Sequence, residues 1–116
     1  MTINEVVEVV IDSTGGYKFI VAEVTDGVTK RLVVRAQENC SYHRDILDVL
    51  RMDLRANRMT ARCIGGGHIA IDPVAMTINI WSSSGDFGVE PDRADTVRML
   101  QAAYPEWKVT GKSGGY

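Results

Sequence analysis

Cysteine is scarce in this sequence, and no long apolar stretch or basic run occurs in it. The 2 cysteines, Cys40 and Cys63, lie far apart and outside any Cys-x-x-Cys spacing, so we expect reduced thiols rather than a disulfide framework. No apolar stretch approaches the roughly 18 residues of a membrane span. The start is acidic, where a signal peptide needs basic residues. We therefore expect a cytoplasmic protein that does not contact a membrane.

The charge balance argues against a nucleic-acid clamp. Thirteen Lys and Arg face 15 Asp and Glu, which gives a formal net charge of -2, whereas such a clamp needs clustered positive charge. A chain of 116 residues with 45% hydrophobic positions buries enough core to fold without a metal or disulfide. We predict a single domain over residues 1–116, a monomer that needs no cofactor.

Runs rich in β-branched residues predict six strands, over residues 5–11, 17–24, 30–35, 59–71, 77–81 and 107–110. Gly15-Gly16 and Asp26-Gly27 separate the first three runs, which favours two hairpins in an antiparallel meander. The triple glycine at 65–67 interrupts the fourth run and indicates a bulge or a close approach of backbone.

Two amphipathic segments predict helices. From residue 43 to 57, apolar residues recur at helical spacing behind Ser41, a predicted N-cap, and this places His43 in the first turn on the buried side. Pro91 is expected to open the second helix, whose predicted buried stripe is Val97, Leu100, Ala103 and Tyr104. The order of strands, helix, strands, helix and strand predicts an α+β fold.

His43 is the first candidate for chemistry. A helix N-terminus attracts anions and disfavours imidazolium, and a neutral histidine can act as general base or nucleophile. A capping or core histidine is the alternative. The small residues of the loop 82–88 could form an anion nest or an ordinary surface loop. Lys18 and Arg35 lie on predicted strands, where cations usually stay solvated or snorkel.

Zinc binding is a further alternative, because two thiols and two imidazoles are spaced as a tetrahedral site could accept. The ligands would be Cys40, His43, Cys63 and His68. Against this, Cys63 lies within a predicted strand rather than in a knuckle turn, and the chain is long enough to fold unaided. We therefore expect no metal.

Several segments together resemble the Janus/Ocnus family, the phosphohistidine phosphatases. The likeness runs from about Val9 to the closing Gly115-Tyr116, and its most specific stretches are Tyr42-His43-Arg44-Asp45-Ile46, Cys63-Ile64-Gly65-Gly66-Gly67-His68-Ile69, Ile80-Trp81 and Tyr104-Pro105-Glu106-Trp107-Lys108-Val109. The resemblance implies a cofactor-independent enzyme with a mixed, largely antiparallel sheet flanked by two helices. It also implies removal of phosphate from phosphohistidine in proteins, and in some members from phospholysine.

The resemblance also implies roles for individual residues. His43 matches the catalytic histidine, Lys18 the lysine that contacts phosphate, and Arg35 an arginine near the site. Ser84 and Asp86 match loop positions that bind phosphate largely through backbone N–H groups, together with the N–H of His43.

Two positions depart from the family pattern. His68 stands where the family usually has an arginine, and a neutral imidazole forks to phosphate less well than a guanidinium does. Asp86 stands where a small residue is usual, and its carboxylate would repel a phosphate if it turned inward. We expect His68 to touch the substrate and Asp86 to contribute its N–H.

These inferences predict a metal-independent hydrolase that cleaves the P–N bond of phosphohistidine in a protein or peptide and releases inorganic phosphate. The alternative is a non-catalytic module that binds phosphorylated ligands at the same anion site.

Overall fold

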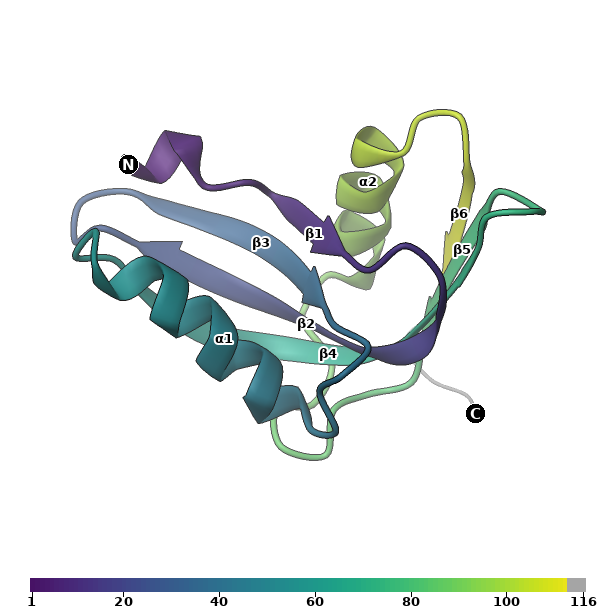
Figure 1. Cartoon of the computed structure of the whole chain (residues 1–116), viewed down its shortest axis with the longest axis horizontal. Coiled ribbons are helices and arrows are strands. Elements are labelled where there is room, and N and C mark those ends of the chain that lie inside the picture. Colours follow the sequence, from purple (N-terminus) through teal and green to yellow (C-terminus); the bar gives the residue numbers. More distant parts are fainter. Residues whose placement is uncertain (113–116) are drawn as a thin grey trace.

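The computed structural model describes residues 1–112 and confirms the α+β class, with a mixed six-stranded sheet and two helices (Figure 1). The expected family match at Gly115 and Tyr116 lies outside the described residues. Along the chain the elements are η1 (Ile3–Glu5), β1 (Val9–Ile11), β2 (Gly15–Thr25), β3 (Lys30–Ala36), α1 (His43–Arg55), β4 (Thr60–Asp72), β5 (Thr77–Trp81), α2 (Arg93–Ala103) and β6 (Lys108–Gly111). No helix in this part of the chain is long and apolar enough to cross a membrane.

The two longest strands, β2 and β4, lie side by side in the middle of the sheet, whose order is β1-β3-β2-β4-β5-β6. The hairpins β2–β3 and β4–β5 are antiparallel, and so is the central β2–β4 pair. The outer pairs, β1–β3 and β5–β6, are parallel. The sheet is therefore mixed and largely antiparallel, as the resemblance implied.

The predicted hairpin between the first two runs is wrong. β1 does not pair with β2; it pairs in parallel with β3, with Val9 opposite Val34. β2 already has β3 on one edge and β4 on the other, so it has no edge left for β1, which joins the outer edge of β3. The strand also begins later than predicted: Glu5 belongs to η1, which buries Ile3 in the core, and residues 6–8 lie between η1 and β1.

Helix α1 begins at His43 and buries the side chains that the periodicity predicted, His43, Ile46, Leu47, Leu50 and Leu54. Its N-cap is Tyr42 rather than Ser41. The Tyr42 N–H donates to the Asp45 carboxylate at 3.0 Å, so the first turn is closed by an acidic side chain reaching back. The prediction that His43 lies in the buried first turn is confirmed.

Helix α2 begins at Arg93 rather than Pro91, because the Asp92 side chain accepts from the Asp95 N–H at 3.1 Å and caps the helix. The predicted apolar stripe is wrong at Ala103, which is exposed. The helix faces a partly polar environment at its N-terminal end, and its buried residues are Arg93, Thr96, Met99 and Leu100.

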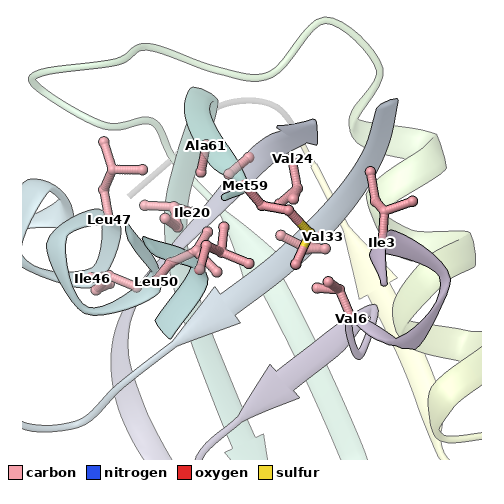
Figure 2. Close-up of a cluster of buried hydrophobic side chains, with 12 residues drawn as sticks. Ile3, Val6, Ile20, Val24, Val33, Ile46, Leu47, Leu50, Met59 and Ala61 are labelled. Carbon is pink, nitrogen blue, oxygen red and sulfur yellow. The ribbon is translucent and has the colours of Figure 1, made fainter. Parts of the chain in front are cut away.

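Each face of the sheet carries its own core, because successive strand side chains point to opposite faces. The α1 side gathers Ile20 and Val33 of the sheet with side chains of the helix, and η1 closes one end of this cluster (Figure 2). The α2 side gathers Phe19, Val21 and Leu100. β2 thus contributes to both cores, and the sheet separates the two helices.

The triple glycine of β4 lets other backbone approach closely, as predicted. The β2–β4 register shifts between Val21 and Ala22, opposite this segment. A Cβ at Gly66 would collide with the Phe19 carbonyl oxygen and lie 3.2 Å from Cδ2 of His43. The first turn of α1 can therefore rest directly on β4.

Candidate functional site

The His43 side chain is buried where α1 meets β4. Only 4% of the residue is exposed, and Nε2 lies 2.9 Å from the Gly67 carbonyl oxygen. A carbonyl oxygen only accepts, so this hydrogen bond requires the proton on Nε2. In the neutral ring, Nδ1 then holds the free lone pair, which a general base or nucleophile needs.

Lys18 and His68 lie beside His43. They face each other across β2 and β4, and the His68 ring stacks on the His43 ring with centroids 6.5 Å apart and 7° between the planes. Trp81, the partner of His68 on β5, packs edge-on against the His68 ring, with 5.9 Å between the ring centroids. Strand pairing thus brings Lys18 and His68 together, and the first turn of α1 adds His43.

A cavity of about 470 Å³ opens beside this cluster. Its lining residues are Gly16, Tyr17, Lys18, Glu38, Cys40, Ser41, His68, Ile69 and Trp81. The backbone N–H of His43, at the first position of α1, donates to no group among residues 1–112, as expected for a first helical turn. The cavity therefore lies beside a cation and near the N-terminus of α1, both of which favour anions.

The pKa of His43 is lowered, mainly by burial. The charge of Lys18 and the neighbouring His68 lower it further, whereas the bond to Gly67 and the carboxylate of Asp86 act in the opposite direction. Burial and Lys18 also lower the pKa of His68. Both imidazoles are accordingly neutral at neutral pH.

Both histidines are expected to titrate below 6.5, the ordinary value. The pKa of each histidine is lower in the folded chain than in the unfolded chain. Between those folded and unfolded pKa values the unfolded chain binds more protons, so the free energy of unfolding falls as the pH drops through that window. The chain has only 2 histidines, so NMR titration of their C2 protons gives both midpoints directly. A His43 midpoint above 6.5 would contradict the effect of burial.

The loop after β5 closes on itself. The Ser84 hydroxyl accepts from the N–H groups of Asp86 at 3.3 Å and Phe87 at 3.1 Å, and Ser84 and Gly88 exchange two backbone hydrogen bonds. Ser84 is buried, whereas Asp86 is exposed with its charge acting on His43. The N–H groups expected to bind an anion are thus engaged within the loop, and a ligand must compete for them.

The model of the Janus/Ocnus family matches residues 3–108. The chain belongs to the Janus/Ocnus family. It is 31% identical over 107 residues to the sex-regulated protein janus-A of Drosophila yakuba, which covers 91% of this chain and 78% of the relative. It is also 31% identical over 105 residues to the sex-regulated protein janus-B of Drosophila sechellia. That alignment covers 86% of this chain and 74% of the relative.

Arg35 of this Janus/Ocnus protein lies apart from the cluster. Its guanidinium donates to the carbonyl oxygens of Val7 at 2.7 Å, Val34 at 2.9 Å and Glu8 at 3.2 Å. Burial lowers its pKa, against the opposing charge of Asp53. Arg35 lines a different cavity, between α1 and the segment before β1. The structure therefore gives it the role of tying that segment to β3.

The two cysteines of the zinc alternative contact other groups in this Janus/Ocnus protein. Cys40 Sγ lies 3.6 Å from the Gln37 side-chain oxygen, and Cys63 Sγ lies 3.3 Å from the Gly65 carbonyl oxygen. Burial raises the pKa of both thiols, that of Cys63 to about 11. Within residues 1–112, no three His, Cys, Asp or Glu side chains are grouped to hold a metal ion.

Sequence reasoning missed Trp81 and Glu38 as cavity residues of the Janus/Ocnus protein. Trp81 could have been found from the β4–β5 hairpin, because the register places it opposite His68. Glu38 carries no such signal, since it lies in the irregular segment between β3 and α1. Reasoning from sequence also missed the buried Glu90 and Arg93 beside the glycine segment.

Proposed function

We propose that this Janus/Ocnus protein hydrolyses the P–N bond of phosphohistidine in a protein or peptide and releases inorganic phosphate. One observation carries the proposal: a buried imidazole that donates from Nε2 to Gly67 and keeps Nδ1 free lies beside Lys18 and a cavity. A neutral base next to a cation is the combination that attack on a phosphoryl group requires. The likeness to the phosphohistidine phosphatases supports the same reaction.

Lys18 and the unpaired N–H of His43 would hold the phosphoryl oxygens and offset their charge. His43 would then follow one of two routes. As a base, Nδ1 takes a proton from water while the water oxygen bonds to phosphorus and the P–N bond breaks; the substrate imidazole leaves with the bonding electrons and takes a proton from solvent, and His43 returns its proton to solvent. As a nucleophile, Nδ1 bonds to phosphorus while the substrate imidazole leaves with the electrons of the broken P–N bond and takes a proton from solvent. Water then bonds to phosphorus, the electrons of the new P–N bond return to Nδ1, and the proton lost by water goes to solvent.

The alternative is a non-catalytic module that binds phosphorylated ligands at the same place. The closed loop favours it, since the N–H groups of Asp86 and Phe87 bond to Ser84. Donors that must first be released stabilise a transition state less than free, preorganised donors do. The two functions differ in turnover, because a binding module holds phosphate without releasing any.

The test is phosphate release from a phosphohistidine peptide in EDTA, with wild type and Lys18→Met. We expect turnover by the wild type and a loss of about 10- to 100-fold in kcat/KM for Lys18→Met, the range expected when one charged contact is lost. Lys30→Met is the matched control, because the Lys30 side chain is 70% exposed and 3.9 Å from Glu23. Phosphate binding without turnover by the wild type would support the binding module instead.

A further inference from the structure

Glu90 and Arg93 form a buried ion pair next to the glycine segment of β4. Their side chains are only 2% and 5% exposed. Arg93 Nε and Nη2 each lie 2.8 Å from a different Glu90 carboxylate oxygen, and the Thr96 hydroxyl donates to the same carboxylate at 2.6 Å. The Arg93 guanidinium also lies over the Phe19 ring, 5.1 Å from its centroid. Packing and a two-point contact thus hold the guanidinium in one orientation.

The remaining donors of Arg93 reach three backbone segments. Nη2, which also donates to Glu90, shares its other N–H between the carbonyl oxygens of Gly66 at 3.0 Å and Ser82 at 3.2 Å, and Nη1 donates to that of Lys112 at 2.8 Å. Gly66 precedes Gly67, which accepts the His43 hydrogen bond. Ser82 begins the loop that Ser84 closes. One side chain therefore connects both parts of the candidate site.

Arg93 bonds to β4 at a point where the neighbouring strand has ended. β5 stops at Trp81, opposite His68, so Gly66 has no partner on β5. The Gly66 N–H donates to the Gly88 carbonyl at 3.1 Å, and the Gly66 carbonyl accepts from Arg93. Buried backbone groups need such partners. Arg93 and the loop thus replace the missing strand directly beneath His43.

Movement of Gly66 would be transmitted to His43. A Cβ built on Gly66 would lie 3.2 Å from Cδ2 of the His43 ring, so backbone and ring are already close. The hydrogen bond from Nε2 to Gly67 adds a second connection. Lys18, His68 and Asp86 are charges that act on the pKa of His43. The link from Arg93 to His43 runs through the backbone, from the Gly66 carbonyl that Arg93 binds to the adjacent Gly67 carbonyl that His43 binds.

We propose that the Glu90–Arg93 ion pair positions His43, by fixing Gly66 and Ser82 so that the Gly67 carbonyl holds the imidazole with its proton on Nε2. The catalytic part of this inference rests on the proposed function; the positioning part does not. A pair that only stabilised the fold would leave the His43 tautomer unchanged in any variant that still folds.

The test compares Arg93→Lys with the control Arg98→Lys. A lysine keeps the charge, but its single ammonium group cannot reproduce the planar fork that donates hydrogen bonds to Glu90, Gly66 and Ser82 at the same time. Arg98 lies on the same helix, 66% exposed and 2.7 Å from Asp95. Imidazole 15N NMR reports which ring nitrogen of His43 carries the proton. We expect Arg93→Lys to populate the Nδ1–H tautomer and to lower kcat about 10- to 100-fold, as small displacements in an active site do, with Arg98→Lys at wild-type values.

A second variant guards against failure to fold. The double variant Glu90→Leu/Arg93→Met removes both charges at similar volume, an exchange that buried pairs often tolerate. Its His43 spectrum should change like that of Arg93→Lys. Wild-type His43 spectra in whichever of these variants folds would overturn the proposal. Because the spectra need no substrate, a wild type without turnover would remove the proposed function while leaving this result to decide the positioning role.

Discussion

His43→Ala is expected to lower kcat for phosphohistidine hydrolysis by about 10²- to 10⁴-fold, the usual contribution of a positioned base. The substitution removes Nδ1, which either abstracts the proton or bonds to phosphorus in the proposed reaction. Phosphate should still bind, since Lys18 and the helix N-terminus remain. Phosphate release under single-turnover conditions measures the first effect, and 31P NMR titration with inorganic phosphate measures the second.

A second variant separates catalysis from packing. His43→Ala also leaves the Gly67 carbonyl, now the partner of Nε2 at 2.9 Å, without a donor. His43→Gln supplies an amide N–H but no basic nitrogen, so it should be as inactive as His43→Ala while folding better. Turnover at the wild-type rate in His43→Gln would mean that the base or nucleophile is another group.

Arg93→Ala is expected to lower the free energy of unfolding by about 3–5 kcal/mol, the usual cost of breaking a buried ion pair. Among residues 1–112, the change leaves the buried Glu90 carboxylate with Thr96 alone as a side-chain partner. It also removes the donor to the carbonyl oxygens of Gly66, Ser82 and Lys112. Urea unfolding followed by tryptophan fluorescence gives the difference.

Arg98→Ala is the control for this measurement. Its guanidinium contacts Asp95 at 2.7 Å and Asp92 at 3.8 Å, but it is 66% exposed. Exposed pairs contribute at most about 1 kcal/mol, so the loss should be several-fold smaller than for Arg93→Ala. Equal losses in the free energy of unfolding for the two variants would show that the buried Glu90–Arg93 pair stabilises the fold no more than an exposed pair does.

The local pattern of residues in the sequence was sufficient to predict the positions of both helices and of most strands. Apolar residues of α1 recur at helical spacing whatever the helix packs against, so its position could be predicted. The partner of β1 could not be predicted, because alternation and β-branched content identify a strand but do not determine which strand it pairs with. The parallel pairing of Val9 with Val34 depends on β2 having no free edge. That is a property of the assembled sheet.

In the candidate site, too, some residues could be predicted from local pattern and others could not. His43 was predictable because a single local feature, the first helical turn, defines its surroundings. The pairing of Lys18 with His68 depends on the irregularity at Val21 and Ala22, and a shift of one residue would send one of the two side chains to the opposite face. Arg93 was missed because a Glu and an Arg three residues apart normally indicate an exposed ion pair.

The reach of Arg93 also bears on the order in which the protein acquires its site. Its carbonyl partners lie 27, 11 and 19 residues away along the chain, at Gly66, Ser82 and Lys112, and His43 lies 24 residues from Gly67. Contacts between distant segments form slowly, because chain entropy is lost before they stabilise the fold. During synthesis, α1 and the β2–β3 hairpin emerge well before Lys112. A nascent chain can therefore contain a formed α1 and still lack the arrangement around His43 until its last strand has docked.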